Sequence, residues 1–66
     1  MDERIKKAIM RELTVPLWPT TGRALGLSRT ATYEAAKRGD IQTIDMGHKK
    51  PVPTAWLRKA LRIEAV

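Results

Sequence analysis

Glycines and prolines divide this chain of 66 residues into short segments, and their positions constrain the fold more than any other feature. Pro16 and Pro19 cannot continue a helix that begins near the N-terminus, because proline lacks the backbone N–H. Gly26 and Gly39 stand where left-handed glycine caps commonly end helices. No apolar stretch approaches the roughly 20 residues that a bilayer-spanning helix needs. We therefore expect one small domain of short helices.

Residues 2–13 have the pattern of an amphipathic helix. Ile5, Ala8, Ile9 and Leu13 recur at helical spacing, and the cationic residues lie on the other faces. The pattern usually indicates a surface helix that packs through its apolar face. The alternative is an arm that stays frayed until it meets DNA or a neighbouring subunit.

Two further helices follow at the spacing of a helix-turn-helix. The first is expected over residues 20–25, with Pro19 in its first turn, and it must stop at Gly26. The second is expected over residues 29–38, with Ser28 as its N-cap and Gly39 at its end.

A helical wheel predicts that residues 29–38 have two different faces. The inner face is small and uncharged, and is formed by Ala31, Thr32 and Ala35. The outer face carries two cations, a hydroxyl and a phenol, from Arg29, Thr30, Tyr33 and Lys37. We interpret the inner face as the side that packs on the preceding helix and the outer face as a nucleic-acid-binding side.

After Gly39 the pattern changes to the period of a strand. Residues 41–46 are expected to form a strand with Ile44 and Met46 on one face. Residues 47–50 turn the chain and residues 51–53 return it, so that a hairpin with a cationic tip is predicted, with its proline-containing strand at an edge.

A closing helix is expected after Thr54, which we take as its cap. Its apolar face is predicted to contain Trp56, Leu57, Ala60 and Leu61, with Ile63 as a further candidate, and Arg58 and Arg62 are predicted to form a stripe on the opposite side. We assign Trp56 to the core, whereas Trp18 between two prolines fits either the core or a partner surface.

The order of these elements predicts a mainly α fold with a small β-hairpin, a winged helix-turn-helix. Residues 1–13 form an N-terminal helix or arm, and residues 14–66 form the winged domain.

The composition favours a binding protein over an enzyme. The chain has one serine, one histidine and no cysteine, and its carboxylates are scattered, so no catalytic or metal-binding group of residues is predicted. We expect no enzymatic activity, no cofactor and no metal. The formal net charge of +6 suits nucleic acid or an anionic membrane surface, although a soluble surface with a basic bias has the same charge.

The central part of the chain resembles the MerR-like winged-helix domains of the excisionase family, the recombination directionality factors of mobile elements. The resemblance covers about residues 14–62 and depends on the turn Leu25-Gly26-Leu27-Ser28-Arg29-Thr30, on Tyr33, on Lys37-Arg38-Gly39-Asp40-Ile41, on Gly47-His48-Lys49-Lys50, on Val52-Pro53, and on Leu57 and Leu61.

The resemblance implies a sequence-specific, cytoplasmic and nucleoid-associated DNA-binding protein. Such a protein binds adjacent sites head to tail, bends the duplex and directs a tyrosine or serine integrase toward excision. The residues expected to contact DNA are Arg23, Ser28, Arg29, Thr30, Tyr33, Lys37, Arg38, His48, Lys49 and Lys50.

Arg29 is the expected base-reading residue, because a guanidinium pairs bidentately with guanine. Three other functions remain open. They are a small MerR-like transcriptional regulator, a basic helical peptide that binds membranes or a partner, and an RNA-binding module.

Overall fold

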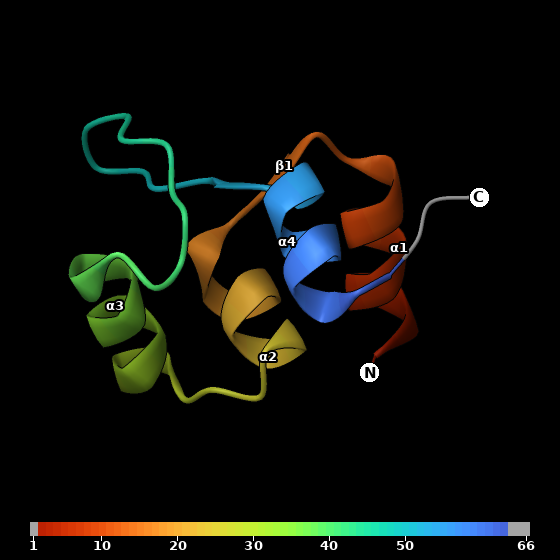
Figure 1. Cartoon of the computed structure of the whole chain (residues 1–66), viewed down its shortest axis with the longest axis horizontal. Coiled ribbons are helices and arrows are strands. Elements are labelled where there is room, and N and C mark those ends of the chain that lie inside the picture. Colours follow the sequence, from red (N-terminus) through yellow and green to blue (C-terminus); the bar gives the residue numbers. More distant parts are fainter. Residues whose placement is uncertain (1, 64–66) are drawn as a thin grey trace.

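Short helices and a two-stranded antiparallel sheet form the fold of residues 2–63, the part of the chain that this computed structural model describes. In chain order the elements are α1 (Glu3–Arg11), β1 (Thr14–Val15), the helical turn η1 (Leu17–Thr21), α2 (Gly22–Ala24), α3 (Arg29–Arg38), β2 (Val52–Pro53) and α4 (Thr54–Leu61). Figure 1 shows α1 and α4 together at one end of the molecule, α2 in the middle and α3 at the other end.

The core is thin and draws one or two residues from nearly every element. Its fully or almost fully buried apolar side chains are Ile9, Val15, Leu17, Ala35, Ile41, Val52 and Leu57. The chain has no cysteine, so no disulfide adds to its stability. Burial of these few apolar side chains is therefore the main favourable contribution to folding.

Helix α1 begins and ends for local reasons. The Asp2 carboxylate accepts a hydrogen bond of 2.8 Å from the backbone N–H of Arg4, so Asp2 is the N-cap. Ile9 is completely buried, which confirms the amphipathic packing. The helix ends at Arg11, earlier than predicted, and this places Leu13 outside it with 89% of its surface exposed. The assignment of Leu13 to the packed face was therefore wrong.

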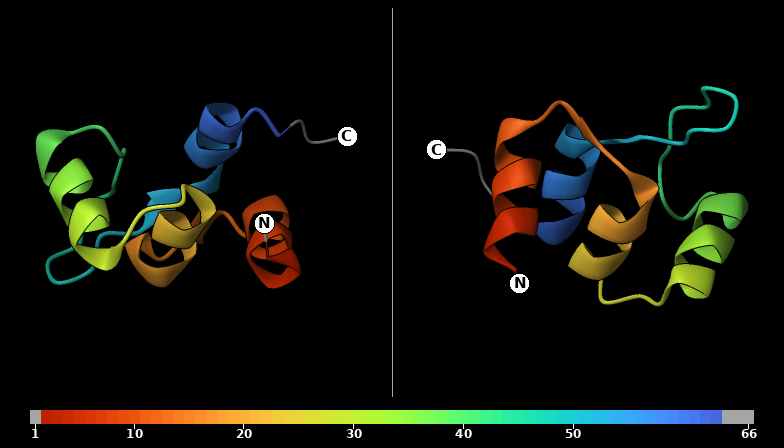
Figure 2. Two further views of the ribbon diagram at one scale, coloured as in Figure 1. Left: turned by 90° about the horizontal axis from the view of Figure 1, so that it is seen from below. Right: turned by 180° about the vertical axis from the view of Figure 1, so that it is seen from behind.

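Helix α4 packs beside α1, as both views of Figure 2 show. The guanidinium of Arg58 donates a hydrogen bond of 2.7 Å to the carbonyl of Ile9. This carbonyl lies in the last turn of α1, where backbone acceptors have no partner within the helix. The predicted outward stripe through Arg58 and Arg62 was wrong for Arg58. Its side chain points inward and donates to the Ile9 carbonyl, which has no partner within α1.

The apolar face of α4 is largely as predicted, with one exception. Leu57 is fully buried, and Trp56 and Leu61 pack against the core. Ala60 is exposed, so it does not belong to this face.

Thr54 links the start of α4 to the segment that follows α1, and it does not cap α4. Pro53 is the N-cap residue and makes no side-chain hydrogen bond. The hydroxyl of Thr54, buried in the fold, lies 2.6 Å from the carbonyl oxygen of Glu12 and 2.9 Å from that of Leu13. It donates to these acceptors because the end of α1 leaves them without helical partners.

The sheet pairs different segments from those the sequence predicted. Strand β2 pairs antiparallel with β1, with Val52 opposite Val15 and Pro53 opposite Thr14. Residues 41–46 are not a strand: Ile41 is buried, but Ile44 and Met46 are exposed. The predicted hairpin between 41–46 and 51–53 forms only in part: Ile44 bonds to Pro51 and Met46 pairs with Lys49, but no continuous ladder forms, and Val52 pairs with Val15.

Gly22, the first residue of α2, lies against Thr32 of α3 and the ring of Trp18. A Cβ atom at this position would collide with the Thr32 hydroxyl and with the ring of Trp18. Thr32 cannot retreat easily, because it is fully buried and donates a hydrogen bond of 2.7 Å to the carbonyl of Ser28.

We therefore expect Gly22→Ala to lower the free energy of unfolding by about 1–3 kcal/mol, the usual cost of overpacking. Urea denaturation followed by circular dichroism measures this loss. In a Trp18→Ala background the same substitution should cost less, because one of the two colliding groups is gone. An equal cost in both backgrounds would show that overlap with the Trp18 ring does not contribute to the loss.

Candidate nucleic-acid interface

Helix α3 has the boundaries that the sequence predicted. The Ser28 hydroxyl accepts a hydrogen bond of 3.2 Å from the backbone N–H of Ala31. Gly39 ends the helix in the left-handed conformation with φ of 88°, and the N–H of Asp40 donates to the carbonyl of Ala35 at 2.9 Å. These caps fix the length of the helix and therefore the spacing of the side chains it presents.

The two faces of α3 also agree with the helical wheel. Thr32 and Ala35 are buried and Ala31 is half-buried, so the small face packs inward. The predicted outer face consists of four residues that are all exposed, and it is called the α3 face: Arg29, Thr30, Tyr33 and Lys37.

Two exposed arginines stack on aromatic rings at this end of the molecule. The guanidinium carbon of Arg29 lies 5.9 Å from the centre of the Tyr33 ring, and that of Arg23 lies 5.8 Å from the centre of the Trp18 ring. Such cation–π contacts restrict the side chains while their N–H donors stay available. Trp18, which the sequence assigned to either core or surface, is half-buried beneath Arg23.

Residues 44–51 form a narrow loop, here called the wing. The N–H of Ile44 donates to the carbonyl of Pro51 at 2.9 Å, and Met46 and Lys49 pair as an isolated bridge. Gly47 makes the turn with φ of 72°. The basic tip was therefore predicted correctly. The wing is held by backbone pairs at two points and not by a continuous hairpin. His48, Lys49 and Lys50 are exposed on it.

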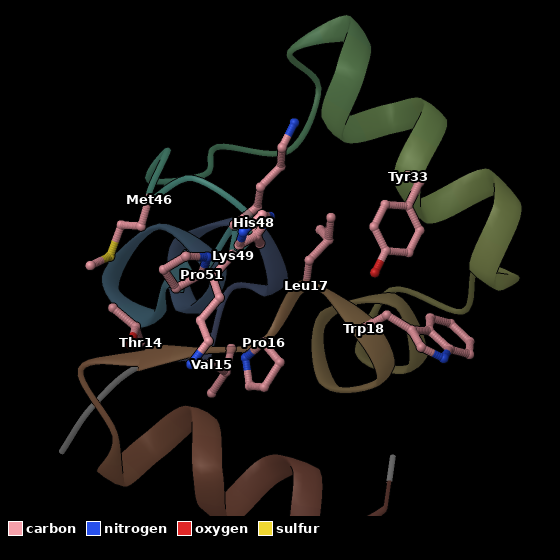
Figure 3. A pocket seen from close by; sticks show the side chains of 11 residues that line it. Thr14, Val15, Pro16, Leu17, Trp18, Tyr33, Met46, His48, Lys49 and Pro51 are labelled. Atoms are coloured by element: carbon pink, nitrogen blue, oxygen red, sulfur yellow. The ribbon is translucent and has the colours of Figure 1, made fainter.

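A groove separates α3 from the wing. Figure 3 shows Tyr33 and Trp18 on one side and the wing residues on the other, with Leu17 between them. The wing contributes His48, Lys49 and Lys50 to the groove lining. The fold thus brings together an aromatic residue of α3 and basic residues of the wing that are separated in the sequence by more than ten positions.

Arg38 and Ser28 have roles within the chain as well. The Nε of Arg38 donates to the Asp40 carboxylate at 3.0 Å, the one ion pair found within residues 2–63. This pairing offsets the charge of Arg38, so it offers less to an anion than Lys37 does. The Ser28 hydroxyl is engaged as the cap of α3.

Comparison with known proteins assigns no family to the chain, because no family model, curated protein or solved structure matches it. Within residues 2–63, no helix has the length and apolar character to cross a bilayer. The geometry of the groove and of the α3 face therefore carries the functional proposal.

Sequence reasoning missed two residues that border the groove. Trp18 was left open between the core and a partner surface, and Met46 was placed with Ile44 on one face of a predicted strand. Met46 is 64% exposed and lines the groove together with His48. The position of Trp18 between two prolines was the available signal for an irregular, partly exposed side chain. No feature of the sequence around Met46 indicates that its side chain is exposed at the groove.

Proposed function

We propose that this protein is a winged helix-turn-helix domain that binds double-stranded DNA, with α3 in the major groove and the wing on the adjoining backbone and minor groove. The observation that carries the proposal is the groove lined by Tyr33 of the α3 face on one side and by His48, Lys49 and Lys50 of the wing on the other. In helix-turn-helix proteins the second helix of the motif enters the major groove.

The shape of the groove suits one strand of a duplex. In B-DNA a single sugar–phosphate strand separates the major groove from the next minor groove. A strand seated between α3 and the wing would lie against Lys49 and Lys50, while Arg29 and Thr30 face the base edges. Phosphate contacts would position the domain and base contacts would select the sequence.

Each residue then has a distinct role. Arg29 reads guanine, and Thr30 and Tyr33 contact base edges, thymine methyl groups or phosphate. The residues that bind phosphate are Lys37, Arg23, His48, Lys49 and Lys50. Arg38 contributes less because of its pairing with Asp40.

We expect Arg29→Ala to relax sequence selectivity by about 5- to 160-fold, the value of one bidentate base contact of about 1–3 kcal/mol. Selection from random duplexes, followed by binding measurements on selected and scrambled sites, measures the ratio. Arg4→Ala on α1 is the matched control, because Arg4 is also exposed but belongs to the opposite end of the molecule. Unchanged selectivity in Arg29→Ala would assign base reading to another residue.

The similarity to excisionases extends the proposal to recombination. A domain of this size covers a short site, so several copies bound head to tail on adjacent sites would together give the overall bend that an integrase complex requires. An excision assay with the integrase encoded on the same element, run alongside a promoter reporter, tests this role. Reporter activity without excision would favour the small transcriptional regulator.

A further inference from the structure

Two large apolar side chains on the wing face solvent. Met46 and Ile44 are 64% and 41% exposed, although the chain has a thin core in which such side chains would be useful. Neither contributes to the buried cluster. The wing therefore combines an apolar part with a cationic tip, a combination that phosphate binding alone does not explain.

Met46 occupies a defined place on the wing. It immediately precedes Gly47, and its backbone pairs with Lys49 across the turn. Figure 3 shows it at the edge of the groove opposite Tyr33, beyond the positions of His48 and Pro51. If one DNA strand lies in the groove, Met46 is on the far side of that strand from α3, where the minor groove begins.

We infer that Met46 is a wedge that inserts between two stacked base pairs from the minor groove and kinks the duplex. This inference rests on the proposed DNA binding. Methionine is one of the apolar residues that minor-groove proteins use for partial intercalation, with kinks of about 20–90°. Met46 is preceded by the exposed Asp45 and followed, after Gly47, by His48, Lys49 and Lys50, so that an apolar side chain beside basic residues meets an apolar base stack beside phosphates.

The inference has a mechanical consequence. A single bound copy bends DNA, before any neighbouring copy is added. The bend is expected at flexible pyrimidine–purine steps, where unstacking costs least. The selected binding site should therefore contain such a step on the wing side, a few base pairs from the guanine that Arg29 reads.

The test uses the full chain on a duplex with one selected site. 2-Aminopurine, whose fluorescence rises when it is unstacked, replaces one adenine at a time. Energy transfer between dyes at the duplex ends measures the bend. We expect the wild type to raise the fluorescence severalfold at one step and to shorten the distance between the ends.

Two variants separate apolar insertion from mere bulk. Met46→Gln has nearly the same length but a polar end, and should lose the fluorescence rise and the bend while binding within about tenfold of the wild type. Met46→Leu should retain both signals. Leu13→Ala is the control, because Leu13 is an exposed apolar residue that does not line the groove.

The outcomes are distinguishable. A wild type that binds the duplex without unstacking or bending it would overturn the wedge and leave the proposed function intact. A wild type that binds no duplex would overturn both. If Met46→Gln keeps the bend but dissociates a dimer in sedimentation without DNA, Met46 contacts a second copy and the wedge is refuted.

Discussion

Raising the salt concentration from about 50 to about 200 mM is expected to weaken duplex binding by about 250- to 1000-fold. The reason is the number of exposed cations at the groove and on the α3 face. Arg23, Lys37, His48, Lys49 and Lys50, the residues assigned to phosphate, are all exposed, and none of the five makes an ion pair within residues 2–63. Neutralising about five phosphates gives a slope of about −4 to −5 for log affinity against log salt.

Fluorescence anisotropy over a series of salt concentrations measures this slope. Replacing Lys49 and Lys50 together with alanine should reduce its size by about 2, because two counterion-releasing contacts are lost. The matched control replaces Lys6 and Lys7, two exposed lysines of α1, and should leave the slope unchanged. A wild-type slope near zero would contradict the electrostatic part of the proposed function.

The second large effect concerns stability. Leu57→Ala is expected to lower the free energy of unfolding by about 2–5 kcal/mol, because it leaves a cavity at a completely buried position. A core in a chain of this size rarely provides more than about 3–5 kcal/mol in total. We therefore expect the variant to be largely unfolded at room temperature, with most of its helical circular dichroism lost.

Leu13→Ala is the control for this substitution, since it removes the same atoms from a side chain that is 89% exposed. Its effect should stay within about 0.5 kcal/mol. Equal losses in the two variants would mean that Leu57 is not in a packed core.

The sequence predicted most reliably what local chemistry decides. The ends of α3 depend on Ser28 and Gly39, which are adjacent to the helix they terminate. The outer face of α3 follows from the helical period alone, and all four predicted residues are exposed. The cationic tip of the wing follows from a glycine turn next to basic residues.

Pairing between distant segments was not predictable in the same way. Nothing in residues 41–46 shows that they will pair with the returning segment at only two points, or that Val52 will pair with Val15. The sequence around Thr54 predicts a helix cap, and the sequence around Arg58 predicts a solvated cation. Their actual partners are backbone carbonyls of residues 9, 12 and 13, which become neighbours only after folding.

The same limit applies to the candidate site. The α3 face and the wing tip were each predicted, but the groove between them depends on how the segment from Thr14 to Trp18 passes beneath both. That segment comprises β1, Pro16 and the start of η1, and it has no periodic pattern. Its contribution to the interface is therefore a property of the tertiary structure.

The pairing of α1 with α4 has a practical consequence for anyone working with this protein. Both helices lie at the end of the molecule remote from α3 and the wing, as Figures 1 and 2 show. A dye, an affinity handle or a second protein joined to the exposed side of either helix would project away from the proposed DNA-binding surface. Genetic fusions at this end would therefore leave the groove and the α3 face unobstructed, and they could test whether that surface is occupied.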